Sequence, residues 1–332
     1  MRREAIDVFE CLKCRGALRI KSVSSEDRAV AEIAEGMLEC EACQASFPIV
    51  RHLPRFVPSD SYASTFGFQW NRFDRIQIDK FMHNDLSRDR FYATTGWPTR
   101  LDGQRVLEAG CGAGRFTQLA LETGAEVFSF DLSSAVDAAW QNNAGTSKLT
   151  AFQASIYEIP LRKEAFDKVF CMGVLQHCPD VAGAFRSLLP FLRPGGEIVI
   201  DVYEKSNGFP PLKYLVRPFV KHLNTESIYN LLRWTIPPTF EVKKAIHRIP
   251  VVGPRIGALI PIGPISHAPR LNYTDAELKQ VKILSALDML SPVYDQPQRM
   301  EDVRRWFEEA GLVEIQLTRG YNGINAKGKR PN

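Results

Sequence analysis

Short apolar runs alternate with stretches of helical periodicity through the middle of the chain. The runs predict strands, and the stretches between them place apolar residues on one helical face, as Phe116, Leu119 and Ala120 do before the helix-ending Gly124. Strands alternating with helices at this spacing predict βαβ units and a doubly wound, mostly parallel α/β sheet. Right-handed crossovers bring the loops after the strands to one edge of that sheet. The strands expected in this region are 106–108, 126–130, 149–153, 167–172 and 197–202, and the helices include 115–123 and 180–191, the second capped by Asp180.

The first 58 residues lack this alternation and predict a small N-terminal module. Two Cys-x-x-Cys pairs, Cys11/Cys14 and Cys40/Cys43, are joined by a polar stretch and a short helical pattern over 29–36. Residues 59–100 follow as a linker rich in aromatic side chains, which we expect to be mostly helical and to pack on the sheet.

The alternation stops at Tyr203 and resumes near the C-terminal end of the chain. Residues 205–290 contain many prolines and scattered helical patterns, which predicts a mainly helical insertion after the fifth strand, placed as a substrate lid. We therefore expect 101–204 and 291–332 to form one α/β domain. Within the insertion, helices are expected over 227–234 and 275–290. After it, a helix is expected over 299–310 and strands over 313–318 and 323–328.

The composition is that of an ordinary soluble globular protein: of 332 residues, 45% are hydrophobic and 24% are charged. No apolar run follows the basic pair at the start, so no signal peptide is expected. No stretch approaches the roughly 18 uninterrupted apolar residues of a membrane span, because prolines break the longest apolar region, 249–265. Paired cysteines without a secretory signal indicate a metal site rather than disulfides, and we expect a reducing, cytoplasmic location.

The positive charge is concentrated in the insertion. Residues 205–290 carry 12 basic and 5 acidic side chains, whereas 101–204 carry 8 basic and 13 acidic ones. A basic lid over a pocket favours an acceptor with an anionic group, such as a phosphate-bearing sugar or a lipid carrier. It also allows peripheral contact with a membrane through the insertion. A solvated basic face without a role in substrate binding is the alternative.

A glycine-rich loop follows the first strand of the α/β region. Gly110, Gly112 and Gly114 allow the backbone to turn tightly and to approach a ligand, and Asp131 stands 21 residues after Gly110, where doubly wound folds place a carboxylate for ribose hydroxyls. A dinucleotide fingerprint needs a third small residue where this chain has Arg115. An acid just before the loop, Glu108, would repel a pyrophosphate but tolerate a cationic ligand.

This loop and three further segments resemble the motifs of class I S-adenosylmethionine-dependent methyltransferases. The segments are 106–116, 130–133, 166–177 and 192–196, and the resemblance covers about 105–203. It implies a Rossmann-like fold, with S-adenosyl-L-methionine as the cofactor and methyl transfer as the activity. By the same resemblance the glycine loop contacts the methionine part and Asp131 the ribose.

The resemblance also extends the cofactor site to later loops. It places Ser155 and Ile156 beside the adenine and Met172 and Gly173 on the pocket floor. This chain departs from the family at Ser155, where an aspartate is frequent. The full set of cofactor-binding residues expected in this way is Glu108, Gly110, Gly112, Gly114, Asp131, Leu132, Ser155, Ile156, Met172 and Gly173.

The spacing of Cys11, Cys14, Cys40 and Cys43 is typical of two zinc knuckles that form a closed, structural four-thiolate site. A single iron in the same cage and thiols without metal are the alternatives. The segment resembles the Trm112-like zinc-binding domain found ahead of some methyltransferase domains.

Methyl transfer needs a base only if the acceptor must lose a proton. His177, just past the fourth strand, is the best candidate, with a capping or core histidine as the alternative. Asp201 and Tyr203 at the end of the fifth strand are further candidates, and His267 and Tyr294 are placed to reach in from the insertion and just after it.

Three functions fit the sequence: methyl transfer to a small molecule, methylation of RNA by way of the zinc module and the basic insertion, and a non-catalytic partner subunit that keeps the fold. The first 58 residues carry nine basic and nine acidic side chains, which disfavours the RNA hypothesis. The intact glycine loop and Asp131 disfavour a non-catalytic subunit. The sequence leaves the identity of the acceptor and the oligomeric state open.

Overall fold

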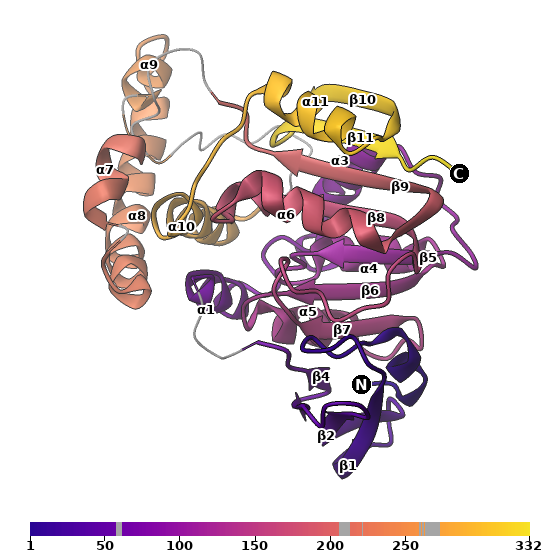
Figure 1. The fold of residues 1–332 in the computed structure, drawn as a ribbon. Helices are drawn as coiled ribbons and strands as arrows, with labels where there is room; N and C mark the ends of the chain where they lie inside the picture. The colour runs from indigo at the N-terminus through magenta and orange to yellow at the C-terminus, as the bar shows by residue number, and fades with distance from the viewer. Residues whose placement is uncertain (58–61, 206–212, 221, 259, 261, 263–272) are drawn as a thin grey trace.

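A computed structural model describes residues 1–57, 62–205, 213–220, 222–258, 260, 262 and 273–332. Within these residues the chain forms a seven-stranded central sheet (Figure 1). Its strands are β5 (Arg105–Ala109), β6 (Glu126–Asp131), β7 (Leu149–Gln153), β8 (Phe166–Met172), β9 (Leu192–Val202), β10 (Val313–Gly320) and β11 (Gly323–Lys329). The spatial order is β10-β11-β9-β8-β5-β6-β7, parallel from β9 to β7, with β11 antiparallel to both of its neighbours. The mostly parallel Rossmann-like sheet expected from the sequence is confirmed.

Helices cover both faces of this sheet because successive strand residues point to opposite sides. Val106 lies in a core with Phe116, whereas its neighbour Leu107 lies in a core with Phe185 and Phe307. The helices of the first core are α3 (Leu86–Thr95), α4 (Arg115–Glu122) and α5 (Ala135–Asn143), and those of the second are α6 (Val181–Leu188) and α11 (Met300–Glu309). Asp180 caps α6 as expected and accepts a hydrogen bond from the amide of Gly183 at 2.8 Å.

The N-terminal residues form a four-stranded antiparallel sheet that follows the 3-10 helix η1 (Arg3–Val8). Its strands are β1 (Leu18–Asp27), β2 (Glu32–Cys40), β3 (Ser46–Val50) and β4 (Leu53–Pro54). The helix expected over 29–36 was wrong: a turn with Ala31 at φ 55° leads directly into β2. Pairing with β1 buries Ile33 and Leu38 completely, and this burial outweighs the helix propensity of the alanines and glutamates.

This N-terminal sheet is joined to the edge of the central sheet at β7. Arg55 forms a parallel bridge with Gln153, and the amide of Phe56 donates to the Gln153 carbonyl at 2.9 Å. The Phe56 ring packs edge-on against Phe152 at 6.3 Å between centroids. The N-terminal residues and the central sheet therefore share one hydrophobic core.

The helices of the insertion, together with α1 of the linker, lie beside the sheet (Figure 1). The linker contains α1 (Ser64–Arg72), α2 (Asp79–Met82) and α3. The insertion contains α7 (Lys213–Val220), α8 (Thr225–His247), α9 (Gly253–Ala258) and α10 (Asp275–Leu290). A separate core joins Phe73 after α1 to Ile228 of α8 and Leu284 of α10. The helix predicted over 275–290 is α10, whereas the one predicted over 227–234 is only the start of the longer α8.

One further boundary differs from the expectation. β9 begins at Leu192, so residues 193–196 lie within the strand rather than before it, with Gly195 at φ 72°. The second half of the apolar region 249–265 lies mostly outside the described residues. Among the helices that the structure describes, none has the length and apolar character needed to cross a membrane.

Candidate active site and metal site

A cavity of about 250 Å³ lies where the parallel strands β5, β6, β8 and β9 end. This edge is where doubly wound sheets bind their ligands. The linker closes one side of the cavity with Tyr62, Phe66 and Trp70. The residues expected from the sequence that line it are Gly110, Gly112, Asp131, Leu132, Ile156, Met172, Gly173, His177 and Tyr203.

The loop after β5 needs glycine because of its backbone conformation and its neighbours. Gly110 has φ 78°, and a Cβ there would lie 2.3 Å from Cγ2 of Val174. Gly112 has φ 53°, and a Cβ there would lie 3.3 Å from the indole nitrogen of Trp70. The loop therefore presents bare backbone to the cavity, which permits a close approach of a ligand.

Asp131 fixes this loop from the end of β6. Its Oδ2 accepts from the Gly112 amide at 3.0 Å, and its Oδ1 accepts from the Ser133 amide at 2.8 Å and hydroxyl at 2.7 Å. Burial raises the pKa of Asp131, an effect that these three donors oppose. The carboxylate is thus oriented and lies in the cavity wall.

Four other predicted residues lie outside the cavity wall. Gly114, at φ 83°, precedes α4 and packs against Ala139 and Asn143. Ser155 accepts from the amide of Tyr157 through its hydroxyl at 3.2 Å. The remaining two, Glu108 and Asp201, are buried and bonded within the protein.

Glu108 lies beneath the glycine loop. Its Oε2 accepts from the hydroxyls of Thr117 at 2.5 Å and Ser129 at 2.7 Å. Burial raises its pKa from 4.5 to about 7. The side chain therefore supports the loop from below, and direct contact with a ligand is not needed to explain its position.

We expect Glu108→Gln to remove a pH dependence of stability. Between pH 4.5 and 7 the folded protein retains a proton that the unfolded chain has lost, so the wild-type free energy of unfolding falls as the pH rises through this range. The full loss is about 3 kcal/mol, and it is complete only above the folded pKa. Urea denaturation across this range should show a flatter curve for Glu108→Gln. The exposed Glu122→Gln is the control, and parallel curves for all three proteins would contradict the shifted pKa.

Asp201 holds the floor of the cavity. Its Oδ2 pairs with the Arg90 guanidinium at 2.6 Å, and its Oδ1 accepts from the Gly173 amide at 2.5 Å and from Asn322 at 3.2 Å. The side chain is completely buried. Three residues thus donate hydrogen bonds to this one carboxylate, which suits a positioning role for Asp201 better than the role of a base.

His177 lines the cavity with one nitrogen already engaged. Its Nδ1 lies 2.9 Å from the carbonyl oxygen of Tyr294. Because a carbonyl oxygen only accepts, Nδ1 carries a proton, and in the neutral ring this leaves the lone pair on Nε2. The rings of Phe66, at 5.0 Å, and Tyr203, at 5.6 Å between centroids, hold the imidazole in place.

The other candidates for a base differ from His177. Burial raises the pKa of Tyr203 above that of an ordinary phenol, so its hydroxyl stays protonated and can donate a hydrogen bond but does not act as a phenolate base. Tyr294 contributes its carbonyl to His177, and its ring packs edge-on against Tyr62. His267 lies outside the described residues.

Two arginines in the cavity wall were missed by sequence reasoning. Arg90 reaches it from α3, and Arg115 from the start of α4. Arg115 is bonded to the Gln77 side-chain oxygen at 2.6 Å and to the Ser87 hydroxyl at 3.2 Å. Burial, and to a smaller extent repulsion from Arg90, lowers the pKa of Arg115 to about 9. The position of Arg115 directly after the last glycine was the available signal, whereas nothing in the sequence marked Arg90.

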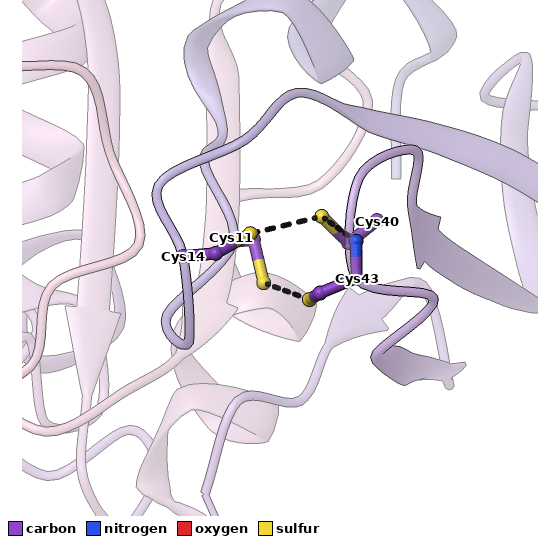
Figure 2. A group of neighbouring side chains, drawn as sticks. All are labelled: Cys11, Cys14, Cys40 and Cys43. Carbon is purple, nitrogen blue, oxygen red and sulfur yellow. Dashed lines mark hydrogen bonds between the residues drawn. The ribbon is translucent and has the colours of Figure 1, made fainter.

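The four N-terminal cysteines meet in one cluster, formed by two loops that face each other (Figure 2). Their Sγ atoms all lie within 4.8 Å of one another, with 3.6 Å between Cys11 and Cys43 and 3.4 Å between Cys14 and Cys40. A tetrahedral zinc with Zn–S bonds of about 2.3 Å requires separations of about 3.8 Å. The donor set therefore fits a four-thiolate metal ion.

Both cysteine loops have the same backbone geometry. The residue after each pair, Arg15 or Gln44, has positive φ and donates its amide to the carbonyl of the first cysteine. Backbone amides also point at sulfur, from Lys13 to Cys11 Sγ at 3.4 Å and from Cys43 to Cys40 Sγ at 3.5 Å. Such amides stabilise negative charge on thiolates.

Comparisons with known proteins identify the central part of the chain. The family model described as "Methyltransferase domain" matches residues 107–200. The malonyl-[acyl-carrier protein] O-methyltransferase of Serratia marcescens is 34% identical over 117 residues, which are 35% of this chain and 45% of that protein. The ubiquinone biosynthesis O-methyltransferase of Pseudomonas fluorescens is 31% identical over 113 residues, 32% of this chain and 47% of that protein.

The matched segment covers about half the length of these curated relatives. A structure of human N-acetylserotonin methyltransferase in complex with S-adenosylmethionine aligns with 83% of this chain and 61% of that chain, at 13% identity and a TM-score of 0.47.

The sheet, the loop after β5 and the matched family together define a class of protein. The chain contains a class I S-adenosylmethionine-dependent methyltransferase domain. Residues 107–200 match the methyltransferase-domain model, and part of the chain is similar to proteins named O-methyltransferases.

Proposed function

We propose that the protein transfers a methyl group from S-adenosylmethionine to a hydroxyl oxygen of a small molecule. The observation that carries this proposal is a single cavity with Gly110, Gly112 and Asp131 in one part of its wall and an oriented His177 in another. The curated relatives are named O-methyltransferases, which supports oxygen as the accepting atom.

S-adenosylmethionine supplies a methyl group activated by the sulfonium charge. We assign the binding of its ribose hydroxyls to Asp131 and the contact with its methionine part to the backbone around Gly110 and Gly112. Among the described residues, no carboxylate forms an ion pair with the half-buried Arg115. Its guanidinium is therefore suited to the carboxylate of the methionine part.

His177 would act on the acceptor. Its Nε2 accepts the hydroxyl proton while the oxygen forms its bond to the methyl carbon and the carbon–sulfur bond breaks. The Tyr294 carbonyl stabilises the imidazolium that results, because it still accepts from Nδ1. Phe66 and Tyr203 restrict the ring, so positioning contributes alongside proton transfer.

We expect Asp131→Ala to weaken the binding of S-adenosylmethionine by about 1–3 kcal/mol, the cost of losing a hydrogen bond to a charged acceptor. Titration calorimetry with the cofactor, its demethylated product and NAD would measure this effect. Asp180→Ala, which removes only the cap of α6, is the matched control. Tight binding of NAD without a response to the sulfonium compound would contradict the proposed cofactor.

The basic insertion led us to expect an acceptor with an anionic group bound under the lid, and the cavity lining restricts where that group can bind. Of the insertion residues that the structure describes, Asp288 alone lines the cavity. An anionic or lipid- or sugar-linked part of the acceptor is therefore expected to remain outside, against the basic insertion, while its hydroxyl enters. The structure gives no support to insertion cations inside the cavity.

A methylation screen tests the proposed function. The full-length protein and labelled cofactor would be incubated separately with small-molecule extract, total RNA and protein extract. Label in an organic-soluble or small polar product supports the proposal. Label found only in RNA or protein would refute the proposal. So would a small-molecule product that the His177→Ala variant forms as fast as the wild type does.

We further propose that the four cysteines bind one structural Zn²⁺. A closed four-thiolate site has no open position, so the metal would stabilise the fold without taking part in methyl transfer. The proposal includes the division of the chain into a zinc-binding module (1–58), an aromatic linker (59–100), a methyltransferase domain (101–204 with 291–332) and an inserted lid (205–290).

A further inference from the structure

Helix α8 has two apolar faces, of which only one is covered. Ile228, Leu232 and Phe240 recur at helical spacing and are buried. On another side of the helix, Leu231 is 60% exposed, Trp234 74% and Val242 55%. The intervals between these three positions also follow the helical repeat. A soluble helix needs one apolar face to pack on its neighbours, so the second face calls for a different explanation.

The neighbouring helices extend this exposed surface. On α7, Leu215 is 62% and Phe219 80% exposed, and Val251 before α9 is 78% exposed. Helices α7, α8 and α9 stand together on the side of α10 that faces away from the central sheet (Figure 1). We call the exposed apolar residues of this layer, Leu215, Phe219, Leu231, Trp234, Val242 and Val251, the α7–α9 face.

Unpaired positive charge accompanies this face. Arg233, Arg248 and Arg255 are exposed, and no carboxylate of the described residues forms an ion pair with them. Two acids of the insertion are engaged with lysines: Asp275 pairs with Lys244, and Glu241 pairs with Lys279. The layer therefore offers apolar side chains and free guanidinium groups together.

We propose that the α7–α9 face docks the protein on the surface of an anionic phospholipid bilayer. Exposed aromatic and aliphatic side chains enter the boundary between headgroups and acyl chains, while arginines contact the lipid phosphates. A second copy of the chain fits less well, because a twofold contact through this face would bring the same unpaired arginines together. No described helix can cross a membrane, so the layer lies on the bilayer.

This docking surface is connected to the cavity through one helix. Ile228 and Leu232 of α8 pack in the core that includes Leu284 of α10, and Asp288 of α10 lines the cavity. Docking would therefore place the cavity beside the lipid headgroups. The inference stands on the exposed side chains and does not depend on the proposed methyl transfer.

Vesicle flotation tests the proposal with the full-length protein. Vesicles of phosphatidylcholine mixed with phosphatidylglycerol should carry the protein upward, whereas pure phosphatidylcholine should carry much less. The double variant Phe219→Ser/Trp234→Ser and the triple variant Arg233→Gln/Arg248→Gln/Arg255→Gln should each lower the partition coefficient at least about tenfold. Val23→Ser/Val313→Ser removes exposed apolar residues from β1 and β10, outside the α7–α9 face, and should bind as the wild type does.

A second measurement uses the wild-type protein and therefore does not depend on whether a variant folds. Spin-labelled acyl chains should quench tryptophan fluorescence of the wild-type protein, because Trp234 is largely exposed. Calorimetry with S-adenosylmethionine would verify that the variants remain folded. Absence of binding to mixed vesicles would overturn the proposal, as would binding that neither variant weakens. A dimer in sedimentation equilibrium that Trp234→Ser dissociates would overturn it in favour of self-association.

Discussion

Replacing His177 by alanine is expected to lower kcat by about 10²–10⁴-fold, the usual contribution of a positioned general base. The hydrogen bond from Nδ1 to the Tyr294 carbonyl fixes the tautomer, so that Nε2 is the nitrogen that accepts the acceptor's proton. The affinity for S-adenosylmethionine should change little, because Asp131 and the glycine loop are untouched. Single-turnover rates with the acceptor found in the screen, together with calorimetry for the cofactor, separate the two effects.

Two comparisons make this prediction specific. His222→Ala, at an exposed position of the insertion, should leave both quantities unchanged. Added imidazole should restore part of the lost rate to His177→Ala, since the truncation leaves space in the cavity wall. An unchanged kcat would show that the acceptor reacts without losing its proton to His177, and the proposed base would be wrong.

Cys40→Ser is expected to release the metal and to unfold the N-terminal module. Elemental analysis of protein purified without chelator should find about one zinc per chain, the number that one closed four-thiolate site holds. Structural zinc contributes on the order of 10 kcal/mol to the folding of small modules, so the loss should make the N-terminal strands accessible to protease at low temperature. The affinity for S-adenosylmethionine should be largely retained, because no residue of the module lines the cavity.

Cys171→Ala provides the matched control. Cys171 is buried in β8 and is not among the four cysteines that meet in the cluster, so its replacement should preserve the metal. Iron in place of zinc would revise the identity of the ion while keeping the site. Protein without any bound metal, or Cys40→Ser protein that retains it, would contradict the site.

The sheet was predictable because its strands are buried on both faces. Strands such as β7 and β8 read as nearly continuous apolar runs, since residues on either side meet helices. The glycine loop was predictable for a related reason: positive φ at Gly110 and Gly112 admits few other residues.

The N-terminal hairpin shows where local patterns fail. Residues 29–36 have the composition of a helix, but the cross-strand partners that bury Ile33 and Leu38 lie on β1 and β3, outside any local window. Arg90 illustrates the same limit for the site. Its importance comes from Asp201, 111 residues further along the chain, and no local pattern predicts that ion pair.

The functional reading of individual acids was limited in the same way. Glu108 and Asp201 stand at the ends of strands, where ligand-binding carboxylates are frequent. Only the structure reveals their partners: Thr117 and Ser129 donate hydrogen bonds to Glu108, and Arg90 forms an ion pair with Asp201. Asp131 has the same kind of position, yet it lies in the cavity wall.

The pairing of Arg55 and Phe56 with β7 has a consequence for how the protein behaves in solution. An edge strand with open amides and carbonyls is a template for sheet-to-sheet aggregation. Here the chain itself occupies part of that edge: Arg55 bridges Gln153, and Phe56 covers the ring of Phe152. The N-terminal module thus protects the catalytic fold from self-association. A methyltransferase domain produced without it would expose a hydrophobic, unpaired strand and would be prone to precipitate.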